Sequence, residues 1–502
     1  MAEWLRVYNA GREDSLVVFV RRAYATRELA ARPAEGIVRG HRLWRQNYGT
    51  FELLRIDSAS AHAIDAFVRG TATGAIGKVY VEVDTSPPHG ITGVWLIPFA
   101  RPPAGLAVRT TRDDAAIVRD LREYASRLAA ADLFSGSIVV RRGDVQLLSA
   151  AYGLARRDPQ EPNTPETRYE LASLSKLFTA VAIGQLVEQG KLRFETTLAE
   201  ALPDYPNAAT GGRITIHHLL THTSGLPDFY RNGKFRQYED SIRSLRDYWP
   251  TFAMDSLWSR PGERHDYSNS NYIVLGAIIE HHSGMAFESY VERHVFAPAG
   301  MTSTCYCEPG APRRATPYSR YTSGFGPGRR SVPDRWIEVP AGAKRPGAPA
   351  GGGISTAEDI ARFGAALLAN RLLSPEMTTR LLTPRVSMDG DGHRGYGFEV
   401  HDWFGTGFVG HGGNFWGVMS QLDIYPETGH VVVVLANNDA SGGEAVRNWT
   451  RRRLAAFSEP ASTATVPLDC RIHSRGTLRR RVARGERGEY RQCRHTRLTG
   501  RR

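Results

Sequence analysis

The 502-residue sequence is poor in cysteine and lysine and has no long hydrophobic run. Its four cysteines include the pair in Cys305-Tyr306-Cys307, but no second such pair and no histidine pair at zinc spacing. We therefore expect incidental thiols and no metal site. No apolar stretch approaches the roughly 20 residues of a membrane-spanning helix, so we expect no transmembrane segment. The first residues do not resemble a signal peptide. The sequence as written thus predicts a cytoplasmic product, or a periplasmic or exported one if the true start lies upstream.

The excess positive charge is concentrated at the C-terminal end. The formal net charge is +12, but the segment from Asp469 to Arg502 holds 12 arginines and three acidic residues, a net +9 that leaves +3 elsewhere. This distribution excludes a basic surface over the whole molecule. Residues 459–502 have few large apolar residues and no periodicity, which predicts a disordered tail. The tail also lacks interleaved aromatic residues, so we expect no specific nucleic acid partner; binding of nucleic acid or an anionic surface by the tail is the alternative.

Residues 1–100 predict a small α+β domain. A helical stretch, residues 4–20, precedes strand-like runs with apolar side chains at every second position, as in Val79, Val81 and Val83. The order of helix and strands resembles the NTF2-like group, although no diagnostic motif supports this. Prolines after this domain indicate a linker. Residues 101–124 are expected to contain this linker and the helix that leads into the next domain. The strand-like runs are residues 51–56, 63–68, 79–84 and 91–97.

Residues 125–458 predict a larger domain of the α/β (α+β) class. Capping-box pairs mark two helices, Thr111 with Asp114 before the domain and Ser355 with Glu358 within it. Strands at both ends of this region, with helices between them, predict a single antiparallel sheet that is assembled from distant segments and flanked by helices. The predicted hairpins are residues 137–140 with 145–150, and residues 418–425 with 430–435.

A serine and a lysine open a strongly apolar helix in the middle of the sequence. Ser173 and Lys176 are three residues apart, so both side chains lie on one face of the first turn of a helix that ends near Gly190. A desolvated amine has a lowered pKa and can take the proton of a serine hydroxyl. Arginine cannot do this because it does not deprotonate. Since only five residues of the chain are lysine, a lysine at this position favours a catalytic base.

Two further segments carry polar residues that suit the same chemistry. Tyr267 and Asn269 are two apart in an extended loop, so both side chains point into one cleft. A tyrosine there can relay a proton, and an asparagine can bind the lysine and a substrate carbonyl. His411-Gly412-Gly413-Asn414 precedes a predicted strand. Its small residues let a substrate lie along the strand edge, where an exposed amide can complete an oxyanion hole with the amide of Ser173.

Each motif alone is weakly specific, but in this order the three resemble the motifs of the serine β-lactamase and penicillin-recognising superfamily. The similarity extends from about Ala125 to Phe457 and is strongest to the class C-like branch, with its D-alanyl-D-alanine carboxypeptidases, D-aminopeptidases and esterases. Further stretches that resemble this branch are residues 214–227, 300–301 and 350–356.

The resemblance implies an acyl-enzyme mechanism without a cofactor. It makes Ser173 the nucleophile, Lys176 the general base, Tyr267 the proton shuttle and Asn269 a hydrogen-bonding partner. His411 stands where the family's third motif places lysine, and Gly413 and Asn414 follow as substrate-binding residues. Because histidine is neutral over much of the physiological range, this departure favours an esterase or peptidase over an efficient β-lactamase.

The predicted function is therefore hydrolysis of a small-molecule or peptide ester or amide by a serine hydrolase. The alternative is a slow penicillin-binding or ligand-sensing protein with little turnover. The oligomeric state cannot be predicted from the sequence.

Overall fold

The protein is described from a computed structural model. The described residues are 1–72, 74, 76–97, 113–307, 310–322, 332, 335–339, 349–388, 392–403, 405–438 and 441–455. The predicted linker up to residue 112 and the predicted arginine-rich tail, residues 459–502, lie outside them.

The N-terminal part consists of four helices followed by an antiparallel sheet in the order β1-β2-β3-β4. The four predicted strands are confirmed. The single helix predicted over residues 4–20 is wrong, because the chain turns at Gly11 with φ +71°, a left-handed conformation that ends helix α1 and that glycine adopts without strain. The elements are α1 (Ala2–Ala10), α2 (Glu13–Ala23), α3 (Thr26–Ala31), α4 (Ala34–Tyr48), β1 (Phe51–Ala59), β2 (Ala63–Gly70), β3 (Ile76–Val83) and β4 (Ile91–Ile97).

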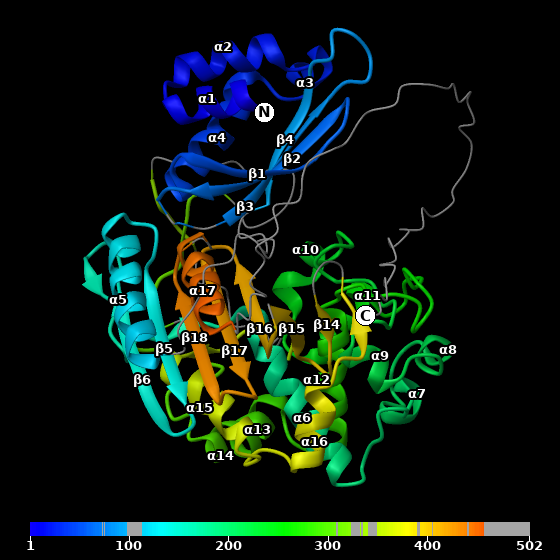
Figure 1. Ribbon diagram of the computed structural model, residues 1–502. Helices are drawn as coiled ribbons and strands as arrows, with labels where there is room; N and C mark the ends of the chain where they lie inside the picture. Colours follow the sequence, from blue (N-terminus) through cyan, green and yellow to red (C-terminus); the bar gives the residue numbers. More distant parts are fainter. Residues whose placement is uncertain are drawn as a thin grey trace, which may run out of the picture. The chain divides into compact units, whose positions relative to one another are not determined.

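A second sheet of eight antiparallel strands has the order β13-β14-β15-β16-β17-β18-β5-β6. Both predicted hairpins are confirmed, and they lie beside each other because β18 pairs with β5. Figure 1 shows the early strands in cyan next to the late strands in orange. The strands are β5 (Gly136–Arg142), β6 (Val145–Tyr152), β13 (Val386–Ser387), β14 (His393–Arg394), β15 (Glu399–Trp403), β16 (Thr406–Phe415), β17 (Val418–Tyr425) and β18 (His430–Ala436).

Helices bury both faces of this sheet, as the apolar pattern of β18 illustrates. Val432 and Val434 belong to a core shared with helices α5 (Asp114–Ala130) and α17 (Ser441–Leu454), whereas Val431 and Val433 belong to the core on the other side. Successive side chains of a strand point to opposite faces, so an uninterrupted run of valines suits a strand that is covered on both. Helices α5 and α17 pack side by side (Figure 1).

The opposite face carries the helical subdomain that holds the candidate site. Its central helices are α6 (Lys176–Glu188) and α12 (Ser270–Ser283), which pack against each other, while α15 (Ala357–Leu368) lies against β18 and β5. The other helices of this part are α7 (Leu198–Ala201), α8 (Ala208–Gly211), α9 (Ile216–Leu220), α10 (Phe235–Tyr238), α11 (Trp249–Phe252), α13 (Phe287–Val291), α14 (Ala297–Ala299) and α16 (Pro375–Leu382).

Short strands connect the subdomain to its surroundings. Strand β12 (Ile354–Ser355) pairs with β9 (Tyr169–Glu170), which leads directly into the segment of Ser173. The remaining short strands are β7 (Leu154–Arg156), β8 (Glu161–Pro162), β10 (Tyr318–Ser319) and β11 (Ile337–Glu338).

The structure corrects both predicted capping boxes. Helix α5 begins at Asp114 and is capped by Asp113, while Thr111 lies outside the described residues. Helix α15 is capped by Thr356, whose hydroxyl accepts the amide of Asp359 at 3.2 Å. A cap must have extended backbone and sit next to the first helical residue, and a sequence pattern places this position only to within a residue or two.

The prediction of incidental thiols is wrong for Cys305 and Cys307, which form a disulfide with their Cα atoms 5.2 Å apart. Cys470 and Cys493 lie outside the described residues. Within the described ranges, no three His, Cys, Asp or Glu side chains are grouped so that they could hold a metal ion. Among the described residues, no helix is both long enough and apolar enough to cross a membrane.

Candidate active site

Ser173 lies at a sharp turn between strand β9 and helix α6. It belongs to a 3₁₀ turn, Ala172–Ser175, so the expected first turn of the α-helix begins only at Lys176. Ala172 has φ +46°, a left-handed conformation that is rare for a residue with a side chain and that is found preferentially at functional sites. The Ser173 side chain is half-buried and remains accessible.

The amine of Lys176 is completely buried and touches three oxygen atoms. Its Nζ lies 3.2 Å from Oγ of Ser173 and 2.8 Å from Oδ1 of Asn269. The third oxygen is the backbone carbonyl of Ala350, in the segment just before β12. Segments that are distant in the sequence therefore meet at one amine.

Burial lowers the pKa of Lys176 to about 7. The carboxylate of Asp228 opposes this shift, and the guanidinium of Arg394 adds to it. An amine with this pKa is neutral in a large fraction of molecules at neutral pH. It can accept a proton from the hydroxyl 3.2 Å away, as a general base must.

Tyr267 closes the site on the other side of Lys176. Its ring centroid lies 5.0 Å from Nζ, and the ring stacks on His222 at a centroid distance of 4.3 Å. Burial raises the pKa of Tyr267, and a hydrogen bond with the side chain of Ser173 lowers it by a smaller amount. The phenol is therefore protonated at neutral pH, which suits a proton relay and not a base.

Asn269 links Lys176 to a buried carboxylate. Its backbone N and its side-chain Nδ2 both donate to Oδ2 of Asp228, at 2.7 and 2.8 Å. Its Oδ1 is thereby turned toward Lys176. The sequence placed Tyr267 and Asn269 in one cleft, and the structure brings both to Lys176 just before helix α12.

The glycines of the third motif let strand β16 approach the nucleophile. A Cβ atom on Gly413 would collide with the carbonyl oxygen of Leu171 and lie 3.0 Å from the amide nitrogen of Ser173. Strand β15 pairs with β16 only as far as Gly410, so residues 411–415 pair with β17 alone among the described strands. The motif was expected to precede a strand; it lies inside one, because glycines continue an extended edge where two backbones meet.

His411 is buried, in contrast to its expected place on the substrate. Its side chain is 2% exposed, and its ring lies 6.3 Å from that of Tyr267. Burial lowers the pKa of His411 to about 4, so the imidazole is neutral at pH 7. Asn414, the last residue of the motif, is by comparison exposed.

Comparison with known proteins identifies the family to which the chain belongs. The family model described as Beta-lactamase matches residues 116–457, which is more than half of the sequence. The chain belongs to the beta-lactamase family. This is a superfamily of serine hydrolases that includes penicillin-binding proteins.

Curated proteins and solved structures that are similar to the chain agree with this assignment. Penicillin-binding protein 4* of Bacillus subtilis is 30% identical over 347 residues, which are 67% of this chain and 75% of that protein. A penicillin binding protein from Bacillus halodurans is 32% identical with a TM-score of 0.54, covering 67% of this chain and 98% of that one. D-amino acid amidase from Ochrobactrum anthropi SV3 shares the fold at 22% identity and a TM-score of 0.57, covering 67% and 98% of the two chains.

The structure adds three residues to the candidate site that the sequence did not predict. Asp228 contacts Asn269, and Arg394 lies 5.8 Å from the ring of Tyr267 and 3.5 Å from Glu399. Only Asp228 carried a signal, since it directly follows the stretch of residues 214–227 that resembles the family. Arg394 and Glu399 come from strands β14 and β15, whose pairing in this sheet no local pattern predicts.

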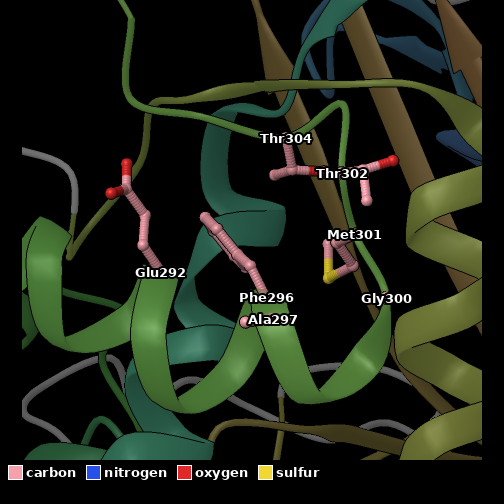
Figure 2. A pocket seen from close by; sticks show the side chains of 7 residues that line it. All are labelled: Glu292, Phe296, Ala297, Gly300, Met301, Thr302 and Thr304. Carbon is pink, nitrogen blue, oxygen red and sulfur yellow. The ribbon is translucent and has the colours of Figure 1, made fainter.

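A separate pocket is lined by the π-helical segment Glu292–Phe296, helix α14 and the loop that follows them (Figure 2). Its volume is about 220 Å³, which is below the roughly 300–1,000 Å³ of typical small-molecule sites. The residues that line it include none of the candidate catalytic residues Ser173, Lys176 and Tyr267. The lining residues are Glu292, Phe296, Ala297, Gly300, Met301, Thr302 and Thr304.

Proposed function

We propose that this member of the beta-lactamase family hydrolyses an ester or amide through an acyl-enzyme on Ser173. The observation that carries the proposal is the buried Lys176 amine, with a pKa of about 7, placed 3.2 Å from the Ser173 hydroxyl. A serine hydroxyl becomes an effective nucleophile only when an adjacent base takes its proton. No other described lysine has this combination of burial and contact with a serine hydroxyl.

In the acylation step, the neutral Nζ of Lys176 takes the proton of Ser173 while Oγ attacks the substrate carbonyl. The C–O bond forms, the carbonyl π bond opens, and the charge collects on the carbonyl oxygen. The backbone amides of Ser173 and Asn414 are the proposed donors to this oxyanion. When the intermediate collapses, the bond to the leaving group breaks. The Lys176 ammonium returns the proton to the leaving group, with the protonated Tyr267 hydroxyl as the relay.

Deacylation reverses these roles with water as the nucleophile. The neutral amine accepts a proton from water, directly or through Tyr267, and the hydroxide adds to the acyl carbon. Collapse of the second intermediate breaks the bond to Ser173 Oγ, which recovers its proton from Lys176. The free acid leaves, and the enzyme returns to its starting protonation state.

The charges around the site favour substrates without a carboxylate next to the scissile bond. His411 is neutral and buried, where relatives with a lysine in the third motif would present a fixed positive charge. The guanidinium of Arg394 is also buried and faces Glu399 at 3.5 Å, which compensates its charge. A neutral ester or amide loses less solvation on entering such a site than a carboxylate does. We therefore propose that the substrates are esters and amides without a carboxylate next to the scissile bond.

Covalent labelling tests the proposal. The full chain is incubated with a fluorophosphonate or a fluorescent penicillin, and the adduct is located by mass spectrometry of peptides. One adduct per chain, on the peptide with Ser173, is expected for wild type and none for Ser173→Ala. Equal labelling of the two proteins contradicts the proposal. Ser175→Ala is the matched control, because Ser175 is in the same turn but donates to the carbonyl of Gly352.

Turnover separates the hydrolase from a slow penicillin-binding or ligand-sensing protein. A panel of p-nitrophenyl esters, nitrocefin and D-amino-acid amides is assayed for product release after acylation. Repeated release at a rate above that of Ser173→Ala supports the hydrolase. An acyl-enzyme that persists for hours with every substrate supports the alternative.

A further inference from the structure

Asp228 is a buried carboxylate held entirely by N–H donors. Its side chain is 2% exposed, and Oδ1 accepts the backbone amides of Tyr230 and Arg231 at 2.9 and 3.1 Å. Oδ2 accepts both N–H groups of Asn269. In the part of the chain that the structure describes, no lysine or arginine forms a salt bridge with it. Two of these four hydrogen bonds thus go to a residue that touches the proposed base.

A carboxylate in this place determines which end of the Asn269 amide faces Lys176. An ionised carboxylate only accepts hydrogen bonds, so it attracts Nδ2 and repels Oδ1. With Nδ2 fixed 2.8 Å from Asp228, Oδ1 must point the other way, and it lies 2.8 Å from Nζ of Lys176. The reversed amide would place two oxygens against each other on one side and an N–H group against the amine on the other.

The orientation of Asn269 decides the direction of the lysine lone pair. A neutral amine has two N–H bonds and one lone pair. Two of the three neighbours of Nζ, Oδ1 of Asn269 and the carbonyl oxygen of Ala350, can only accept hydrogen bonds. If they take the two N–H bonds, the lone pair is left for the third neighbour, the hydroxyl of Ser173. A reversed Asn269 would present an N–H donor and compete with Ser173 for that lone pair.

We propose that Asp228 is a positioning residue of the catalytic site: it fixes the amide of Asn269 so that the lone pair of Lys176 faces Ser173. The inference rests on the proposed function, because it concerns the same base and nucleophile. It assigns to Asp228 an effect on the reaction that passes through Asn269 and does not require contact with the substrate.

The charges around Lys176 provide a second measurement that tests this proposal, the pH dependence of the acylation rate. The charged and titratable groups that influence or face the amine are Asp228, Arg394, Tyr267, Tyr272, His222 and His411. Of these, Asp228 is the carboxylate that raises the pKa of Lys176 against the effect of burial. Removing its charge should therefore lower the pKa of Lys176. The acylation rate, which requires the neutral amine, should then reach its plateau at lower pH.

The test measures the acylation rate per titrated site between pH 5 and 9 for Asp228→Asn. An asparagine offers one acceptor oxygen in place of two, so it no longer distinguishes the two ends of Asn269. The expected plateau rate is about 10- to 100-fold below wild type, as for loss of a hydrogen bond to a charged group, and the acidic midpoint moves down. Wild-type rate and midpoint in a folded Asp228→Asn protein would overturn the proposal.

Two further variants keep the test decisive if Asp228→Asn folds poorly. The exchange Asp228→Asn with Asn269→Asp restores an N–H donor facing a carboxylate and an oxygen facing Lys176. It should recover most of the lost rate, with a midpoint above that of wild type. In addition, Asp228→Asn should slow an Asn269→Ala protein by less than twofold. The proposal is contradicted if the exchange variant is no faster than expected when the rate losses of the two single variants are multiplied. It is also contradicted if Asp228→Asn slows the Asn269→Ala protein by the same factor by which it slows wild type.

A matched control is Asp359→Asn. Asp359 is an equally buried aspartate that accepts the amide of Ser303 at 2.6 Å and the hydroxyl of Thr304 at 2.9 Å, without contact to Lys176. Its replacement should lower thermal stability and leave the pH midpoint unchanged. If wild type is acylated on Ser173 but Asp228→Asn behaves as wild type, only the role of Asp228 fails. If wild type is not acylated on Ser173, the proposed function fails as well.

Discussion

Nζ of Lys176 lies 3.2 Å from Oγ of Ser173, and the lysine side chain has no contact with solvent. Ser173 belongs to a 3₁₀ turn, and Lys176 is the first residue of helix α6 that follows it. The backbone therefore holds the two residues next to each other. A buried amine that is half deprotonated near neutral pH is costly for stability, because burial penalises its charged form. Such groups are concentrated at functional sites, where the lowered pKa serves the reaction.

Lys176→Arg should abolish acylation although it keeps a positive charge. Arginine remains protonated in proteins and cannot take the proton of Ser173. We expect a loss of about 10²–10⁴ in the second-order rate of labelling, the usual range for a general base. A time course of fluorescent labelling measures this rate. Lys191→Arg is the control, because Lys191 is exposed and donates to the carbonyl of His282. A Lys176→Arg protein that acylates within threefold of wild type contradicts the assignment of the base.

The acylation rate should rise with pH to a plateau, with its midpoint near pH 7. The active form of Lys176 is the neutral amine, and burial lowers the pKa of this group to about 7. Below the midpoint the amine is protonated, so the rate falls about tenfold for each pH unit. His411 should add no second step between pH 5.5 and 8, because burial lowers its pKa to about 4. A pH-independent rate from 5 to 9 would exclude the lysine as the base.

Tyr267→Phe should slow amides more than activated esters. The phenol is protonated, since burial raises its pKa, and in the proposed mechanism it relays a proton to the leaving group. A p-nitrophenolate leaves without protonation, whereas an amine cannot leave without it. We expect a loss of about 10²-fold or more for amides and a clearly smaller loss for p-nitrophenyl esters. Equal losses for both substrate types indicate a role in packing against His222 instead.

Gly413→Ala should inactivate the protein, while Gly407→Ala in the same strand should not. A methyl group on Gly413 meets the backbone of Leu171 and the amide nitrogen of Ser173, but one on Gly407 meets no atom within 4 Å. Relieving such an overlap displaces β16 from the nucleophile and costs about 1–3 kcal/mol. Labelling rates and thermal unfolding of both variants check this. Full activity of Gly413→Ala would show that β16 does not need to approach Ser173 so closely.

The sequence predicted the strands well where local pattern decides them. Residues 418–425 and 430–435 alternate between two buried faces and turn at Gly429, and the structure has this hairpin. Local pattern failed at positions set by backbone conformation. The helix over residues 4–20 breaks at Gly11, and Ser173 lies on a 3₁₀ turn after a left-handed Ala172.

The candidate site was predictable only in its motif residues. Ser173, Lys176, Tyr267 and Asn269 carry side chains whose chemistry is recognisable in order, and the structure brings them together. Asp228 could not be assigned a contact from sequence, because it reaches Asn269 across 41 positions through packing of loops. His411 likewise lies 4.0 Å from the Glu399 carboxylate of strand β15, a neighbour that no local pattern predicts.

The most direct test of the central claim is a titration of the lysine side chains by NMR. The chain has five lysines, so a sample labelled with ¹³C at Cε gives few signals, and Lys176→Arg identifies one of them. The account predicts that the Lys176 signal titrates with a midpoint near pH 7, well below the value of about 10.4 that is usual for a solvated lysine side chain. A Lys176 midpoint above pH 9 would mean that the amine is protonated at neutral pH and cannot be the base for Ser173.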